Sequence, residues 1–142
     1  MLVAVIGGNL QGVEAAYLAK QAGWDVLVID KDRRAGASLI CDRFLPLTIT
    51  EEIDPHEILQ GVDLIIPALE NDGVLAVLQK WSLETAIPLA FDMEAYAISS
   101  SKKRSERVFR EIGVNVPRPW PECGFPIVVK PDGESGSRGV KI

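Results

Sequence analysis

The sequence contains few of the residues that bind metals or form disulfides. Its 142 residues include two cysteines and one histidine. Cys41 and Cys123 lie far apart in the chain and outside any motif typical of metal ligands or of a redox pair, so we expect a reducing cytoplasm as the location. His56 has no second histidine or cysteine beside it, and we expect it on the surface in the first turn of a helix. The sequence therefore indicates neither a disulfide framework nor a zinc site.

The sequence also lacks an excess of positive charge and any long apolar run. It has 15 Lys and Arg residues against 20 Asp and Glu residues, a net charge of −5. Such a chain does not attract the phosphates of nucleic acid or an anionic membrane, so we expect neither as a partner. The apolar run at residues 2–6 ends at Gly7 and is far shorter than the roughly 20 residues of a membrane-spanning helix. We expect no signal peptide, because no basic residues precede that run.

Apolar residues are abundant, and their spacing predicts alternating strands and helices. Hydrophobic residues make up 47% of the chain and charged residues 25%, which excludes an intrinsically disordered protein. Apolar segments predict five strands, over residues 2–6, 24–29, 43–47, 62–67 and 89–91. Helical spacing and capping residues predict helices over 10–22, from 54 to about 61, and over 74–81. This order predicts an α/β fold with a Rossmann-like open parallel sheet.

The pattern changes after Asp92. Further helices are predicted over residues 93–98 and 102–112, the second with basic residues that alternate with acidic ones and form a solvated face. Prolines then occupy every second position from Pro117 to Pro121, which excludes a helix and favours an extended linker.

A short apolar segment follows the prolines. Residues 127–130 predict a strand, and Val140 begins another after a loop rich in glycine and serine. A hairpin whose second strand has barely begun cannot form a domain alone, so we expect the chain to be the front part of a longer protein. The predicted organisation is a Rossmann-like domain over 1–115, a linker over 116–125 and the start of a second domain over 126–142.

The turn between the first predicted strand and the first helix is a candidate site. Its sequence, Gly7-Gly8-Asn9-Leu10-Gln11-Gly12, lets backbone N–H groups and the positive end of a helix approach a ligand. A dinucleotide site needs glycine where Asn9 stands, although Asp30 at the end of the next strand resembles the ribose-binding acid of such sites. Three interpretations remain open: a dinucleotide site, a purely structural turn, and a polar small-molecule site that uses Asn9 and Gln11.

A second candidate site follows the fourth predicted strand. Glu70, Asn71 and Asp72 lie there, and ligands bind parallel sheets outside the carboxyl ends of neighbouring strands. The acidic character of this segment suits an ammonium group. The alternative is that Asn71 or Asp72 only caps the following helix, and both interpretations stay open.

A third candidate site lies in the tail. Lys130 ends the apolar strand, and the loop at residues 133–139 that follows is rich in glycine and serine. Such a loop can fold over phosphates and offer N–H and hydroxyl donors to them. It differs from the P-loop, because its lysine precedes the glycines and no helix is predicted after it.

This order of segments resembles the ATP-grasp ligases over the whole chain. Lys102 and the segment from Ser105 to Pro117 are similar to the family's nucleotide-contacting helix and linker. Residues 127–131 resemble the strand whose lysine binds the ATP phosphates, and residues 133–139 resemble the flexible loop that covers them. The resemblance implies the family's Rossmann-like N-terminal domain, followed by the first β-hairpin of its nucleotide-binding domain.

The resemblance also implies a reaction. ATP phosphorylates a carboxylate, and an amine attacks the acyl phosphate to give an amide, with ATP and Mg²⁺ as cofactors. Residues 7–17, 67–71 and 91–99 are most similar to the family members of pyrrolysine biosynthesis, which implies an ornithine-type carboxylate and the side-chain amine of lysine as substrates. The family's metal ligands lie beyond this chain, so we expect the isolated chain to be inactive.

Candidate residues follow from the same resemblance. It implies nucleotide binding by Lys102, Lys130, Glu134, Ser135, Gly136 and Ser137, and contact with the amino-acid substrate by Asn9, Leu10, Gln11, Glu70 and Asn71. The expected partners are ATP, amino acids and a second copy of the chain in a homodimer. The alternative function is a Rossmann-like module that binds NAD(P) or another small molecule without ligase chemistry.

Overall fold

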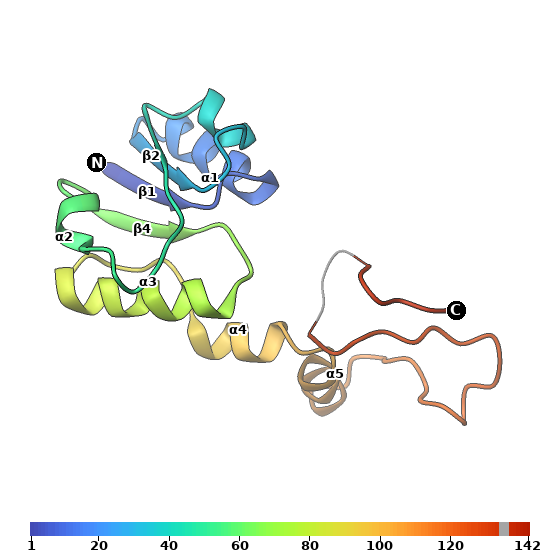
Figure 1. The fold of residues 1–142 in the computed structure, drawn as a ribbon. Helices are drawn as coiled ribbons and strands as arrows, with labels where there is room; N and C mark the ends of the chain where they lie inside the picture. Colours follow the sequence, from blue (N-terminus) through green and yellow to red (C-terminus); the bar gives the residue numbers. More distant parts are fainter. Residues whose placement is uncertain (134–136) are drawn as a thin grey trace. The chain divides into compact units, whose positions relative to one another are not determined.

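The computed structural model describes residues 1–133 and 137–142, and the chain forms two compact units, Met1–Phe91 and Asp92–Ile142. The first unit contains a parallel sheet with the strand order β3-β2-β1-β4 (Figure 1). Its strands are β1 (Leu2–Ile6), β2 (Asp25–Asp30), β3 (Arg43–Pro46) and β4 (Leu64–Pro67). Parallel neighbours require crossover connections, and helical segments lie in each connection of this sheet.

Helices cover both faces of the sheet (Figure 1). One face packs against α1 (Leu10–Gln21) and the 3₁₀ helix η1 (Gly36–Leu39). The other face packs against α2 (Pro55–Ile58) and α3 (Asp72–Thr85). The predicted α/β class with a Rossmann-like parallel sheet is therefore confirmed.

Alternate residues of each strand build two separate hydrophobic cores, because successive side chains point to opposite faces of a sheet. Val3 and Val5 of β1 pack with Ala16 of α1 on one face. Ile6 of the same strand packs with Leu78 of α3 on the other face. Each such fully buried aliphatic side chain stabilises the fold by about 1.5–3 kcal/mol relative to an exposed one. The continuous apolar run in β1 thus reflects burial from both sides.

The observed helix α3 is longer than the helix predicted over residues 74–81. It begins at Asp72 because the side chain of Asn71 caps it, with Oδ1 accepting a hydrogen bond from the N–H of Val74 at 3.0 Å. It continues to Thr85 and ends where Ala86 adopts a left-handed conformation, with φ at 58°. A polar residue thus starts this helix two positions before its apolar pattern becomes visible.

The predicted fifth strand at residues 89–91 is wrong, because the segment forms only one isolated bridge beside β4. Leu89 pairs in parallel with Ile65, and the N–H of Ala90 donates to the carbonyl of Ile65 at 2.8 Å. The N–H of Phe91 then donates to the carbonyl of Leu89 at 2.9 Å, which turns the chain away from the sheet. The sheet therefore has four strands.

The second unit contains α4 (Met93–Ser99) and α5 (Lys102–Glu111). Asp92 caps α4, and Ser101 caps α5, each by accepting hydrogen bonds from N–H groups of the first turn. Neither these helices nor those of the first unit, as far as the structure describes them, have the length and apolar character needed to cross a lipid bilayer.

The predicted hairpin of the tail is present as one antiparallel residue pair. The N–H of Val129 donates to the carbonyl of Lys141 at 2.8 Å, and the N–H of Lys141 donates back at 2.9 Å. No longer strand is formed by the described residues of this tail. The antiparallel direction of the pairing agrees with the prediction, and its length is shorter than predicted.

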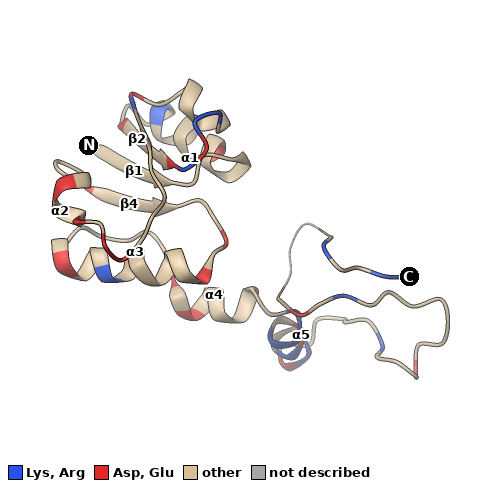
Figure 2. Cartoon of the chain, in the orientation of Figure 1, with Lys and Arg blue, Asp and Glu red and all other residues tan. Residues whose placement is uncertain are grey.

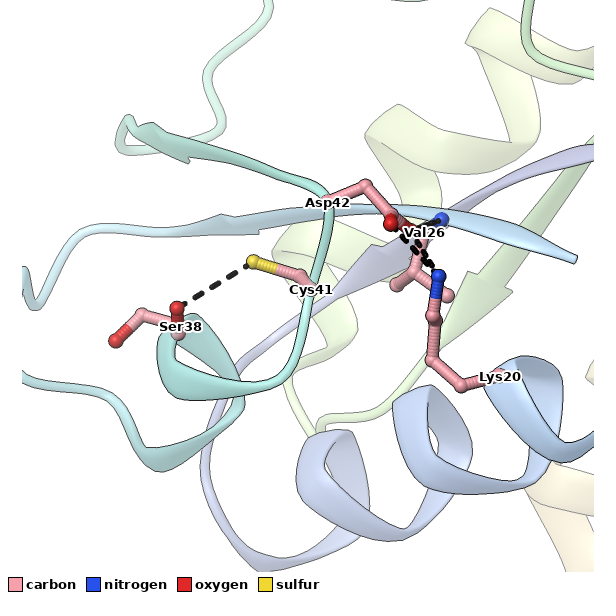
Figure 3. Close-up of polar contacts among 5 residues, drawn as sticks. All are labelled: Lys20, Val26, Ser38, Cys41 and Asp42. Carbon is pink, nitrogen blue, oxygen red and sulfur yellow. Dashed lines mark hydrogen bonds and ion pairs between the residues drawn. The ribbon is translucent and has the colours of Figure 1, made fainter.

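Asp42 connects α1 to the sheet near the start of β2 (Figure 3). Its carboxylate oxygens accept from Nζ of Lys20 at 2.6 and 2.8 Å, and Oδ2 also accepts from the N–H of Val26 at 2.8 Å. The hydrogen bond from Lys20, followed by that from Val26, lowers the pKa of Asp42 below its ordinary value. Burial raises the pKa of the neighbouring Cys41 thiol, which donates to the carbonyl of Ser38 at 3.6 Å and is protonated at neutral pH.

Replacing Asp42 by Asn should lower the free energy of unfolding at pH 7 by about 1 kcal/mol, since Lys20 loses its charged partner at a partly exposed position. A group with a lowered pKa stabilises the fold above its ordinary pKa and loses that contribution as the pH falls through the folded value. Urea unfolding followed by circular dichroism should therefore show a difference between wild type and Asp42→Asn that shrinks on acidification to about pH 3.

The matched control is Asp25→Asn, which changes an exposed acid at the start of β2. It should leave the unfolding free energy nearly unchanged at both pH values. A difference between wild type and Asp42→Asn that is the same at pH 7 and in acid would contradict the assigned role of the ionised carboxylate.

Candidate functional site

The strands β1 and β4 are neighbours, so the segments that follow them leave the sheet at the same edge. Ile6 pairs with Pro67 at the ends of these strands, and the N–H of Ala68 donates to the carbonyl of Ile6 at 2.8 Å. The turn at residues 7–12 follows β1, and the connection at residues 68–71 follows β4. We call this region the carboxyl edge. Ligands of open parallel sheets bind at such edges.

Glycines allow the turn at the carboxyl edge to pack closely against its neighbours. Gly7 has φ at 99°, and a Cβ atom there would lie 2.8 Å from the carbonyl oxygen of Ala68. A Cβ atom on Gly12 would overlap with the carbonyl oxygen of Gly7. Side chains at these positions would push α1 away from β1 and from the β4 connection. The glycines therefore fix the position where α1 begins.

Asp30 at the end of β2 holds this turn through its carboxylate. Its Oδ2 accepts a hydrogen bond from the N–H of Gly8 at 2.6 Å, and its Oδ1 accepts from the N–H of Asp32 at 2.8 Å. The carboxylate thus satisfies one backbone donor of the turn and lies close to the segment that leads into α1.

The three predicted substrate residues of the turn all lie exposed at the carboxyl edge. Asn9 is the N-cap residue of α1, and among the described residues its side chain makes no capping hydrogen bond. Leu10 begins the helix with 83% of its surface exposed, and Gln11 follows it in the same turn. These side chains are accessible to a ligand.

The two predicted substrate residues of the β4 connection differ in their roles. Asn71 caps α3 through the bond to Val74 described above, so the capping interpretation holds for its side-chain oxygen. Glu70 is exposed and lies two residues after Ala68, which contacts the glycine turn. Figure 2 shows acidic positions in the segment between β4 and α3. The fold thus brings Glu70 and the glycine turn to one edge of the sheet.

In the second unit, Asp132 connects the tail to the first turn of α5. Its Oδ2 accepts from the hydroxyl of Ser101 at 2.8 Å, and its Oδ1 accepts from the N–H of Lys103 at 2.8 Å. The carbonyl of Asp132 accepts from the N–H of Lys102 at 3.3 Å and from its Nζ at 3.1 Å. The tail segment and the helix that carries Lys102 are therefore directly bonded.

These contacts stabilise the ionised form of Asp132. The N–H of Lys103, followed by the hydroxyl of Ser101, lowers the pKa of the Asp132 carboxyl below its ordinary value. The carboxylate is therefore ionised at neutral pH and faces the positive end of α5. Figure 2 shows that many positions of this helix are occupied by lysine or arginine, and Arg110 pairs with Glu106 at 2.6 Å.

The structure describes three of the predicted nucleotide-binding residues. Lys102 is the first residue of α5, and Lys130 lies exposed between the paired Val129 and Pro131. Ser137 is exposed and has φ at 63°. The predictions for Glu134, Ser135 and Gly136 lie outside the described residues.

The sequence patterns did not reveal the role of Asp132. Ser101 stands in a run of serines before a helix and is visible as a cap from the sequence alone. Asp132 lies about thirty positions away along the chain, and no local spacing links it to α5. Within the described ranges, no group of three or more His, Cys, Asp or Glu side chains is arranged to hold a metal ion.

Replacing Asp30 by Ala should lower the free energy of unfolding by about 1–3 kcal/mol, because the partly buried N–H of Gly8 loses its acceptor. The change is measured by urea unfolding at neutral pH, with Asp25→Ala as the control at the opposite end of the same strand. Equal stability of the two variants would show that the carboxylate of Asp30 does not hold the glycine turn.

Comparison with known proteins relates the chain to a group of ligases. No model of a protein family matches it. It is 41% identical over 143 residues to a 3-methyl-D-ornithine–L-lysine ligase of Methanosarcina mazei, a match that covers 99% of this chain and 38% of the relative. The corresponding ligase of Methanosarcina acetivorans is 41% identical over 141 residues, with 99% of this chain and 39% of the relative covered. The chain therefore spans less than half the length of these relatives.

Several solved structures have a similar fold. N5-carboxyaminoimidazole ribonucleotide synthetase from Thermus thermophilus matches with a TM-score of 0.63 at 18% identity, over 81% of this chain and 31% of that chain. The phosphoribosylaminoimidazole carboxylase ATPase subunit from Aquifex aeolicus matches with a TM-score of 0.59 at 20% identity, over 83% and 33%. Over nearly all of its length, this chain is thus similar in sequence to the N-terminal portion of 3-methyl-D-ornithine–L-lysine ligases, and it shares its fold with part of these two solved structures.

Proposed function

We propose that this chain is the N-terminal part of an ATP-dependent ligase that joins the carboxylate of an ornithine-type amino acid to the side-chain amine of lysine. The observation that carries this proposal is the 41% identity, over 99% of the chain, to 3-methyl-D-ornithine–L-lysine ligases. In the proposed reaction ATP phosphorylates the carboxylate, and the amine displaces the phosphate to form the amide. Pyrrolysine biosynthesis in the cytoplasm is the proposed setting.

The carboxyl edge is proposed to bind the amino-acid substrate. Its candidate residues are exposed and lie in the glycine turn or just after β4. They are Asn9, Leu10, Gln11, Glu70 and Asn71. The carboxylates of Asp30 and Glu70 make this edge negative, which favours an ammonium group over a phosphate. The amide groups of Asn9 and Gln11 can exchange hydrogen bonds with the polar groups of an amino acid.

The second unit is proposed to contribute to the nucleotide site through Lys102, Lys130 and the loop at residues 134–137. Lysines neutralise the charge of a triphosphate, and a covering loop excludes the water that would hydrolyse an acyl phosphate. A solved structure of similar fold, an N5-carboxyaminoimidazole ribonucleotide synthetase, is an ADP complex, with a TM-score of 0.63 at 16% identity. We assign no Mg²⁺ ligand to the described residues, because they contain no metal-binding group.

The same proposal gives the parts of the chain separate tasks. Residues 1–115 form the substrate domain, 116–125 form the linker, and 126–142 begin the nucleotide-binding domain. On this division the isolated chain lacks most of the nucleotide site and is inactive. A homodimer is the proposed assembly of the complete enzyme.

The proposal is tested in a hybrid enzyme, in which this chain replaces the matching residues of the Methanosarcina mazei ligase. The hybrid should release ADP and form an amide only when ATP, 3-methyl-D-ornithine and L-lysine are all present. Glu70→Ala or Gln11→Ala should raise the KM of an amino-acid substrate by about tenfold, the effect of losing one charge-assisted hydrogen bond, and leave the KM of ATP unchanged.

Glu57→Ala is the control for these variants, because it removes an exposed acid from α2, away from the carboxyl edge. Unchanged kinetics for both Glu70→Ala and Gln11→Ala would contradict the proposed substrate site. Binding of NADH by the unmodified chain with micromolar affinity, measured by calorimetry, would favour the alternative of a dinucleotide-binding module.

A further inference from the structure

Three backbone N–H groups begin helix α5, and all three have acceptors in this structure. The N–H of Lys102 donates to the carbonyl of Asp132 at 3.3 Å, and the N–H of Lys103 donates to the Asp132 carboxylate at 2.8 Å. The N–H of Arg104 donates to the hydroxyl of Ser101 at 3.2 Å. The first N–H groups of a helix have no partner within the helix itself. Asp132 supplies the acceptors for two of them, from a distant part of the chain.

Each oxygen of the Asp132 carboxylate accepts a hydrogen bond from a protein group. One oxygen accepts from the N–H of Lys103, and the other accepts from the hydroxyl of Ser101, both at 2.8 Å. The hydroxyl of Ser101 in turn accepts from the N–H of Arg104, so the two capping residues form one connected network. Because both oxygens accept hydrogen bonds from the protein, the role that this geometry supports is to fix the positions of neighbouring groups.

The network joins the two lysines that the proposed function assigns to the nucleotide. Lys102 begins α5, and its Nζ donates to the carbonyl of Asp132 at 3.1 Å. Lys130 precedes Asp132 by two residues, with the conformationally restricted Pro131 between them. Few rotatable backbone bonds therefore separate Lys130 from the anchored Asp132.

We propose that Asp132 is a positioning residue for ATP, which fixes the separation of Lys102 and Lys130 by bonding the tail to the first turn of α5. This inference rests on the proposed function, because it concerns the same nucleotide site. When the two lysines are already held at a fixed separation, binding a triphosphate does not cost the conformational entropy of ordering the tail. Loss of the Asp132 carboxylate removes the side-chain bonds between the tail and α5 and leaves only the bonds to the carbonyl of Asp132. The tail is then held less firmly, and nucleotide binding weakens although the carboxylate does not touch the nucleotide.

The hybrid enzyme described above tests this role. Asp132→Ala should raise the KM of ATP by about tenfold and leave the KM of both amino acids unchanged, since it removes a charge-assisted network from the nucleotide side only. Lys130→Ala should raise the KM of ATP by about tenfold or more, and it sets the scale for direct loss of a phosphate contact. Asp132→Asn retains an acceptor for the N–H of Lys103 and should restore most of the ATP affinity.

Asp92→Ala is the matched control, because Asp92 caps α4 in the same unit by accepting from the N–H groups of Glu94 and Ala95, both at 2.9 Å. It removes a helix cap of the same chemistry without touching the Asp132 network, and it should leave the KM of ATP unchanged. An equal rise in the KM of ATP for Asp92→Ala and Asp132→Ala would show a general effect of lost helix capping and would overturn the positioning role.

A second measurement covers the case in which Asp132→Ala lowers the yield of folded hybrid. In ¹⁵N NMR spectra of this chain, Asp132→Asn and Asp132→Ala should shift the amide signals of both Lys103 and Lys130, whereas Asp92→Ala should shift neither. An unchanged Lys130 signal would overturn the inference. An active wild-type hybrid whose KM for ATP is unaffected by Asp132→Ala would also overturn it while leaving the proposed function intact. A wild-type hybrid that does not use ATP would overturn the proposed function and this role together.

Discussion

The close approach of the β1–α1 turn to the β4 connection is the constraint on which the candidate substrate site depends. It requires glycine at positions 7 and 12, where a Cβ atom would collide with backbone carbonyl oxygens. Asp30 completes the turn by accepting the N–H of Gly8 at 2.6 Å. The same contacts that let α1 pack against the sheet therefore present Asn9 and Gln11 to solvent and make the edge negative.

In the second unit, a polar tail is held beside the basic helix α5. Its described residues bury little apolar surface, and α5 contains no buried residue. Hydrogen bonds to Asp132 replace hydrophobic packing as the connection between the tail and the helix. A connection of this kind leaves Lys102 and Lys130 at the surface, where phosphates can reach them. In the proposed reaction, the first unit thus suits a cationic amino acid and the second unit suits an anionic nucleotide.

Local sequence patterns predicted the first four strands and the helices α1, α2 and α3, because apolar runs and caps such as Asp54 act over a few residues. They did not predict the 3₁₀ helix η1. They failed at residues 89–91, where a hydrogen bond from Phe91 to Leu89 turns an apolar segment away from the sheet. In the candidate sites, exposure at Glu70 could be anticipated from its place after a strand. The contacts of Asp132 could not be predicted from the sequence, because they join residues about thirty positions apart and produce no periodic pattern in it.

The central claim is that the carboxyl edge binds an amino acid and not a dinucleotide. The most direct test is ¹⁵N NMR of this chain during titration with 3-methyl-D-ornithine and, separately, with NADH. The amino acid should shift the amide signals of residues 8–11 and of Glu70 and Asn71 until they saturate, and NADH should leave them unchanged. Saturable shifts of the same signals with NADH, and none with the amino acid, would contradict the claim.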